Sequence, residues 1–260
     1  MRSAKETKIY YKRTKLRNPV LFVGLPGIGS IGSLVAEHLR KELKAKKFAT
    51  LYSPHFPYQI IMLENGAFRL VSNRFYYAKG EKGRGDIVIL IGDAQPITTE
   101  GQYEVNEKIV EFFKHLGGSQ IYTIGGYSTG AQYVKTPRVF GLATDAVTVA
   151  RMKKYGVTPT NAAGMSVIGS AGMIVAFSKK HKINAACIMG ETGLLDVDAN
   201  SAKAVLQVVG KLIGREINPG SIEKLSGETE RIINELEERR LMPFPAETAS
   251  APREEPGYIR

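Results

Sequence analysis

Short apolar runs alternate with segments of helical periodicity along most of the chain. Residues 86–91 read DIVILI, a nearly continuous apolar run typical of a central strand in a parallel sheet that is covered on both faces. Such runs predict strands at Val20–Leu25, Phe48–Ser53, Gln59–Leu63, Phe68–Tyr76, Asp86–Ile91, Gln120–Ile124, Arg138–Ala143 and Ala185–Met189. Helical periodicity predicts helices at Ile31–Lys46, Thr99–Leu116, Asp145–Tyr155, Ala171–His181, Ser201–Leu212 and Ile222–Leu241. The alternation predicts a layered α/β domain with a mostly parallel sheet and helices on both faces.

One predicted hairpin interrupts this alternation. Asn65 and Gly66 stand between two apolar runs, and this dipeptide is the strongest short signal for a two-residue hairpin turn. We therefore expect a mixed sheet with a protruding antiparallel part near Gln59–Ala78.

The chain changes character after residue 217. Apolar residues recur at near-helical spacing over residues 218–241, with polar residues between them, and predict a C-terminal helix. The last 19 residues contain four prolines and few apolar side chains, so they cannot bury enough surface to order themselves. The sequence thus predicts an α/β core at 1–217, a C-terminal helix at 218–241 and a disordered, proline-rich tail at 242–260.

Charge and composition narrow the possible partners. The formal net charge is +11, and the first 20 residues contain seven lysines or arginines and one glutamate. A basic segment attracts phosphates, but no interleaving of aromatic and basic residues of the RNP type is present, so nucleic acid is a weak alternative partner. The single cysteine, Cys187, cannot form an internal disulfide, and no paired Cys/His spacing predicts a metal site. No apolar stretch is long enough to span a membrane, and the charged N-terminus lacks the apolar region of a secretory signal, so we expect a cytoplasmic protein.

A glycine-rich turn follows the first predicted strand. Gly27, Gly29 and Gly32 have the G-x-G-x-x-G spacing with which many proteins seat a dinucleotide pyrophosphate on a helix N-terminus. That interpretation also requires an acidic residue at the end of the next strand, to hold the ribose hydroxyls. The next predicted strand, Phe48–Ser53, instead runs into Pro-His-Phe-Pro. The missing carboxylate weakens the case for NAD or FAD.

A near-repeat of this turn favours a structural role for its glycines. IGSIGSLVA at 28–36 recurs as IGSAGMIVA at 168–176, and both copies open a predicted helix. Glycine permits a tight turn and close helix packing, and Ser30 or Ser170 can cap free N–H groups. Packing and turn chemistry is therefore the leading interpretation, an anion site at the helix starts is the second, and a dinucleotide site is the third.

Two loops lie where α/β proteins usually bind ligands, beyond the C-terminal ends of strands. One contains Asp93 and Gln95, and the other contains Tyr127, Ser128 and Thr129. Together with Gly27 and Gly29, these residues form the possible ligand loops. A third polar group follows Met189 and consists of Glu191, Asp196 and Asp198. Because polar loop residues more commonly cap helices, we assign no catalytic residue and no metal ligand.

Four short motifs give the sequence a resemblance to a known family. They are GLPGIG at 24–29, ILIGDAQP at 89–96, YTIGGYSTG at 122–130 and GETG at 190–193. Their order and spacing over roughly residues 15–215 resemble the archaeal branch of the proteasome assembly chaperone family. The resemblance implies a fold like the purine nucleoside phosphorylase-type α/β domain, with no established catalytic site and no cofactor. It also implies a homo-oligomer that binds the proteasome α-subunit ring.

The resemblance draws attention to the C-terminal tail. Family members are expected to dock through a terminal sequence of a hydrophobic residue, tyrosine and any residue. This chain ends Gly257-Tyr258-Ile259-Arg260, so the tyrosine is third from last and a glycine replaces the hydrophobic residue. The expected partner-binding residues are Tyr258, Ile259 and Arg260, on a semi-extended tether with an aromatic anchor near its tip.

Two hypotheses about function follow. The first is a non-enzymatic, homo-oligomeric proteasome assembly chaperone that binds α-subunits or the α-ring partly through its tail. The alternative is an enzyme on the same α/β fold that acts on a nucleoside or on a phosphate-containing small molecule. The alternative requires the loops after Ile91 and Ile124 to form one deep pocket with ordered polar groups.

Overall fold

The fold is built around a mixed sheet of nine strands. The computed structural model describes residues 6–81, 83–131, 133–160, 166–193, 195–228 and 231. Across the sheet the order is β1 (Lys8–Tyr11), β3 (Lys46–Tyr52), β6 (Asn73–Ala78), β7 (Ile87–Gly92), β2 (Val20–Gly24), β8 (Gln120–Ser128), β11 (Asn184–Thr192), β9 (Val139–Ala143) and β10 (Thr158–Pro159). Its central strands, from β7 through β2 and β8 to β11, are all parallel. The strands β1, β3 and β6 add an antiparallel part at one side, and β9 pairs antiparallel with β11 at the other.

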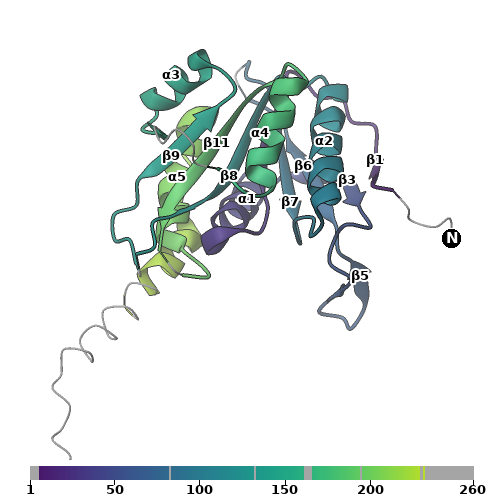
Figure 1. Ribbon diagram of the computed structural model, residues 1–260, viewed down its shortest axis with the longest axis horizontal. Helices are drawn as coiled ribbons and strands as arrows, with labels where there is room; N and C mark the ends of the chain where they lie inside the picture. The colour runs from purple at the N-terminus through teal and green to yellow at the C-terminus, as the bar shows by residue number, and fades with distance from the viewer. Residues whose placement is uncertain are drawn as a thin grey trace, which may run out of the picture. The chain divides into compact units, whose positions relative to one another are not determined.

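Helices cover both faces of this sheet and enclose two hydrophobic cores. The helices α2 (Thr99–His115) and α4 (Ser170–Lys180) pack side by side on one face (Figure 1). The helices α1 (Ile31–Glu42) and α5 (Ala199–Ile213) pack on the other face, where Met152 of α3 (Ala146–Lys154) joins their core. The consecutive, fully buried residues Ile89 and Leu90 of β7 point to opposite cores, as strand alternation requires. The layered, mostly parallel α/β fold is as predicted.

The predicted hairpin forms, but the strand predicted after its turn is divided into two strands. The strands β4 (Ile60–Met62) and β5 (Phe68–Leu70) pair around a turn in which Gly66 has a φ of 77°. They form a small sheet of their own, which extends from the main sheet (Figure 1). The single strand predicted at Phe68–Tyr76 was therefore wrong, because the chain leaves one sheet at Leu70 and enters the other at Asn73.

Several predicted boundaries also shift. The helix α1 ends at Glu42 rather than at Lys46, because Lys44 turns into the left-handed region with a φ of 48° and the next strand begins at Lys46. The strands β8 and β11 run further than predicted, since their parallel ladder continues to Ser128 and Thr192. The short strand β1 was not predicted because its charged and aromatic residues give no clear alternation.

The C-terminal part of the chain is described as far as its first helical turns. Residues 220–228 are helical, and Ile222 is buried in the core beneath α1 and α5. The rest of the predicted helix, apart from Arg231, and the whole predicted tail lie outside the described residues, as do Tyr258, Ile259 and Arg260. Among the helices that the structure describes, none has the length and apolar character needed to cross a membrane.

Candidate functional site

The glycine-rich turn holds α1 against the carboxyl ends of the central strands. A short 3-10 turn, Ile28–Ser30, precedes α1, and buried Gly29 has a φ of 63°, which favours glycine. A side chain at Gly32 would place its Cβ atom 2.6 Å from the carbonyl oxygen of Ile124 and 2.9 Å from that of Leu25. Glycine at position 32 therefore permits a helix-to-sheet approach that no other residue allows without movement of the backbone.

The serines of the two near-repeats do not cap their helices. The Ser30 hydroxyl donates instead to the carbonyl oxygen of Asp196, at 2.9 Å. At the start of α4, the Ser170 N–H donates to the side-chain oxygen of Gln95, at 2.8 Å. The side-chain amide of Gln95 also donates to the carbonyl oxygen of Pro26, at 2.6 Å. Gln95 thus joins the two helix starts, and at the start of α4 it accepts the N–H that a serine was expected to cap.

A cavity of about 520 Å³ lies between these two helix starts. Its walls are mainly aliphatic side chains and glycine backbone, and they include Gly27. Its amide side chains are those of Gln95 and Gln102, and both already hold the surrounding loops, because Gln102 donates to the carbonyl oxygen of Pro96 at 2.7 Å. Asp93, Tyr127, Ser128 and Thr129 do not line it. The two loops therefore meet at one cavity, but their polar side chains do not converge there.

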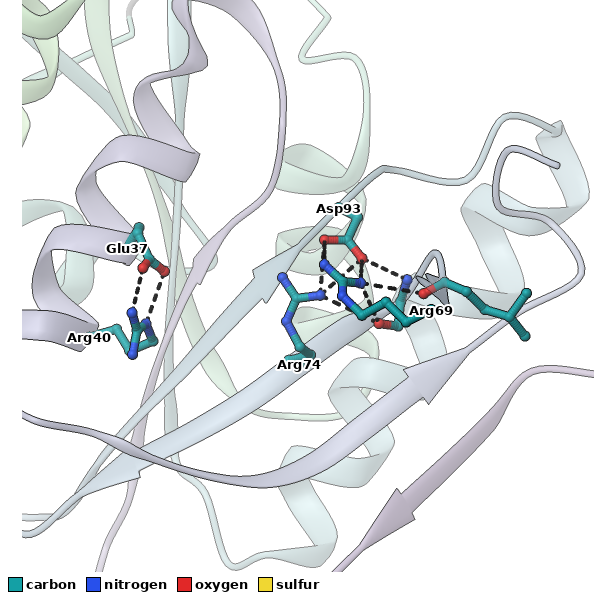
Figure 2. Close-up of polar contacts among 7 residues, drawn as sticks. Glu37, Arg40, Arg69, Arg74 and Asp93 are labelled. Atoms are coloured by element: carbon teal, nitrogen blue, oxygen red, sulfur yellow. Dashed lines mark hydrogen bonds and ion pairs between the residues drawn. The ribbon is translucent and has the colours of Figure 1, made fainter. Parts of the chain in front are cut away.

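Asp93 instead fastens the hairpin to the main sheet. Figure 2 shows its carboxylate between the guanidinium groups of Arg69, on β5, and Arg74, on β6. Arg69 and Arg74 each donate to it at 2.9 Å, and the Ser72 N–H donates at 3.0 Å. The Asp93 side chain is only 9% exposed. Because Ser72 gives its N–H to this carboxylate at the break between β5 and β6, Asp93 fixes the direction in which the hairpin leaves the sheet.

The remaining predicted loop residues have structural contacts along β8 and β11. Tyr127 and Ser128 belong to the end of β8 rather than to the loop after it, and the Tyr127 ring packs against Phe140 with ring centroids 4.9 Å apart. The N–H of Thr129 donates to the carbonyl oxygen of Thr192, at 3.1 Å. The Thr129 hydrogen bond continues the β8–β11 ladder beyond its last paired residues.

In the third polar group, which follows Met189, Asp198 and Glu191 make separate contacts. Asp198 is fully buried and caps α5, accepting from the Ser201 N–H at 2.9 Å and from the Thr192 hydroxyl at 2.6 Å. Glu191 pairs with Arg138 at 2.7 Å, and this contact holds the pKa of the Glu191 carboxyl below its usual range. The structure therefore does not bring these two carboxylates together as a metal site or as an acid and base pair.

A chain of hydrogen bonds around His55 has the residue types of a catalytic triad but not its setting. The two ring nitrogens lie 2.8 Å from the Thr98 hydroxyl and 3.1 Å from the Glu104 carboxylate. The Thr98 hydroxyl also accepts the Gly101 N–H as the cap of α2, and Glu104 accepts the N–H of Thr7. None of these residues lines the cavity at the strand ends. This chain of hydrogen bonds ties the start of β1 to α2. The single thiol, that of Cys187, is also unsuited to catalysis, because burial raises its pKa to about 11.

Asp86 is a second buried carboxylate with a structural role. It is 2% exposed and accepts hydrogen bonds from the backbone N–H groups of Arg17 and Gly80 and from the ammonium group of Lys79, at 2.8, 3.0 and 2.9 Å. Burial opposes its ionisation, but these donors outweigh burial and lower the pKa of Asp86. The pKa of Asp93 is lowered in the same way by Arg69, Ser72 and Arg74.

These lowered pKa values predict a loss of stability in acid. A carboxyl whose pKa is lower in the folded than in the unfolded chain stabilises the fold above its unfolded pKa of about 3.9, and the stabilisation is lost as the pH falls through the folded pKa. We expect the free energy of unfolding in urea to fall below about pH 4. The Asp86→Asn variant should be less stable at neutral pH and show a smaller acid-induced fall. An identical fall in the variant and the natural chain would contradict the assignment to Asp86.

Comparisons with known proteins place this geometry in a family. Residues 21–237 match the model of the PAC2 family. An uncharacterized protein of Methanocaldococcus jannaschii is 32% identical over 240 residues, which cover 92% of this chain and 91% of that protein. The structure of PbaB from Pyrococcus furiosus, described as an archaeal proteasome activator, superimposes with a TM-score of 0.84 at 37% identity, covering 90% of this chain and 99% of that one.

A more distant structure shares the fold. PbaA from Pyrococcus furiosus, described as an archaeal homolog of proteasome-assembly chaperone, has a TM-score of 0.74 at 22% identity, covering 91% of this chain and 93% of that one. The resemblance expected from the four sequence motifs is confirmed. By its family match and its curated relative, this chain belongs to the PAC2 family.

Proposed function

We propose that this protein is a non-enzymatic, homo-oligomeric proteasome-binding factor that acts on proteasome α-subunits or the α-ring. The likeness to PbaB, 37% identical over nearly its whole length and described as a proteasome activator, is the observation that carries the proposal. The four sequence motifs, GLPGIG, ILIGDAQP, YTIGGYSTG and GETG, support the same family of functions. Assembly chaperone is the role expected from the sequence, and activation is a second candidate because of the description of PbaB.

The cavity at the strand ends favours binding over catalysis. An enzyme acting on a nucleoside or a phosphate-containing molecule needs polar groups that converge on the substrate. Here the amides of Gln95 and Gln102 are used to hold loops, and Asp93 is held between two arginines outside the cavity. Glycines 29 and 32 support close packing in the same region. These observations support a protein-binding role.

The hairpin is the proposed surface for self-association. Tyr58 is fully exposed beside it, and Met62, Phe68 and Leu70 are each at least 60% exposed. A groove lined by apolar residues, including Phe56 and Ile60, runs between the hairpin and β1. Because exposed apolar side chains gathered on one element are typical of interfaces, a second copy of this chain is the proposed occupant.

Self-association predicts a measurable effect of the hairpin residues. Light scattering at about 10 µM should show an oligomer for the natural chain and a smaller species when Met62 and Phe68 are both replaced by serine. Val147→Ser is the matched control, because Val147 is 79% exposed on α3, away from the hairpin. A monomer for the natural chain would contradict the proposal of self-association, and unchanged assembly of the double variant would exclude the hairpin as its surface.

The tail is the proposed anchor for the α-ring. A segment that becomes ordered on binding needs a compact anchor, and Tyr258 is the last aromatic residue of the chain, with Ile259 as its apolar neighbour. We expect Tyr258→Ala to weaken α-ring binding by about 1–3 kcal/mol, roughly 5- to 150-fold. Phe244→Ala, the other aromatic residue of the tail, should have a smaller effect. Equal affinities of Tyr258→Ala and the natural chain, measured by surface plasmon resonance, would mean that the folded domain meets the ring.

A capture experiment tests the proposal as a whole. Isolated α-subunits and assembled proteasomes are each passed over the immobilised full-length protein and over a variant that lacks residues 242–260. Capture by the full-length protein, reduced in the shortened variant, is the expected result. Peptide hydrolysis by the assembled proteasome, measured with and without the protein, distinguishes activation from assembly. Failure to capture either form would overturn the proposal.

A further inference from the structure

A second cavity lies at the opposite end of the parallel strands from the glycine-rich turn. It has a volume of about 660 Å³, within the range of small-molecule sites. Val20, Ile87 and Gln120, at the amino ends of β2, β7 and β8, contribute to its wall. Leu43 and Ile213, at the carboxyl ends of α1 and α5, contribute from the helix side. The proposed function assigns no role to this cavity.

The inner wall of the cavity includes a tyrosine that is largely buried. Tyr122 lines the cavity, stacks on Phe22 with ring centroids 5.3 Å apart, and is only 4% exposed. Within the described part of the chain, its hydroxyl makes no hydrogen bond and is available as a donor in the cavity that the residue lines. Burial raises the pKa of Tyr122, so the hydroxyl remains protonated and can donate.

The rim of the cavity is cationic. The charged side chains among its described lining residues are those of Lys79, Arg84, Arg151, Arg215 and Glu81. Lys79 and Arg215 already pair with carboxylates, Asp86 and Glu81. Arg84 and Arg151 form no ion pair with any residue that the structure describes. Two guanidinium groups at the rim are therefore available to an anion.

Both guanidinium groups are also held in place. Arg84 donates to the carbonyl oxygen of Ile213 at 3.0 Å, and Arg151 donates to the side-chain oxygen of Gln120. Each of these bonds uses one of the five N–H donors of a guanidinium group. Arg151 and Tyr122 line the same cavity, together with Gln120. A positioned cation and an unused hydroxyl donor thus act on the same region.

We propose that this cavity binds a small organic anion, a phosphomonoester with an aromatic body. Arg151 and the Tyr122 hydroxyl donate to the phosphate oxygens, and Arg84 adds to the attractive potential at the rim. The apolar wall of Phe22, Leu43 and Ile213 receives the aromatic body. The combination of apolar surface with a few fixed donors is what small-ligand sites require.

Calorimetric titration of the full-length protein with phenyl phosphate tests this proposal. Inorganic phosphate and phenol serve as the two halves of the ligand, and each should bind at least about 10-fold more weakly than phenyl phosphate, because each makes only half of the contacts. Arg151→Gln and Tyr122→Phe should each weaken phenyl phosphate binding by about 10-fold, since each removes a hydrogen bond to a charged group. Lys203→Gln is the control, because Lys203 pairs with Glu223 outside the cavity and its loss should not alter binding.

Thermal unfolding separates a ligand-binding role from a structural role of Tyr122. Tyr122→Phe keeps the stacked ring and removes only a hydroxyl without a partner, so the melting temperature of the free protein should be unchanged or higher. Phenyl phosphate should raise the melting temperature of the natural chain more than that of the variant. Failure of phenyl phosphate to bind at about 1 mM, equal binding of inorganic phosphate, or binding that neither variant weakens would overturn the proposal.

Discussion

Gly32→Ala is expected to lower the free energy of unfolding by about 3 kcal/mol, because the added methyl group meets backbone rather than flexible side chains. Its Cβ atom would lie 2.6 Å from the carbonyl oxygen of Ile124, so either α1 or β8 must move. The better helix propensity of alanine, worth about 1 kcal/mol, offsets only part of this cost. Urea unfolding at neutral pH measures the difference directly.

Gly27→Ala is the matched control in the same turn. Gly27 has an extended φ of −173°, and its added Cβ atom would lie 3.5 Å from the Gln95 side chain, an ordinary contact. We expect this variant to change stability by less than about 0.5 kcal/mol. A similar loss in both variants would contradict the close-packing role assigned to Gly32. The pair of variants therefore distinguishes the individual roles of glycines that share one motif.

Asp93→Ala is expected to cost about 3 kcal/mol, because it leaves Arg74 largely buried without its counter-charge. The Arg74 side chain is 17% exposed, and its guanidinium group makes both of its ion-pair contacts with the Asp93 carboxylate. The variant also releases the Ser72 N–H and the Arg69 side chain, which hold the start of the hairpin. Urea unfolding gives the stability, and light scattering of the same samples shows whether hairpin placement affects assembly.

An exposed ion pair on α1 provides the control for Asp93. Glu37 pairs with Arg40 one turn away, and Figure 2 shows this contact apart from the Asp93 cluster. Their side chains are 39% and 28% exposed, so solvent screens the pair. Glu37→Ala should cost less than about 1 kcal/mol. If the two alanine variants lose equal stability, the Asp93 contacts are not the main support of the hairpin.

Features encoded by neighbouring residues could be predicted from the sequence. The apolar run 86–91 gave a central strand, and the Asn65-Gly66 pair gave the hairpin turn. Each depends on contacts within a few residues, and local preferences are strong there. The four motifs identified the family because their order and spacing can be read directly from the sequence, without knowledge of the fold.

Features that join distant segments could not be predicted in this way. The break between β5 and β6 depends on Asp93, about twenty residues further along the chain, and nothing in the local sequence Phe68–Tyr76 indicates it. Gln95, rather than either serine, satisfies the start of α4 because folding brings the loop after β7 beside residue 170. The cavity around Tyr122 also needs Arg84 and Arg151, which come from separate elements. Such sites appear only once the sheet order is known.

The strands at the two edges of the main sheet are shorter than its central strands. At one edge β10 has only two residues, and one of them is Pro159, which has no N–H to offer a new strand. At the other edge β1 has only four residues, including Lys8, and exposed lysine on a short strand disfavours edge-to-edge pairing. Copies of this protein are therefore poorly suited to join by extending one sheet into the next, which guards against the open-ended fibrous aggregation to which exposed sheet edges are prone.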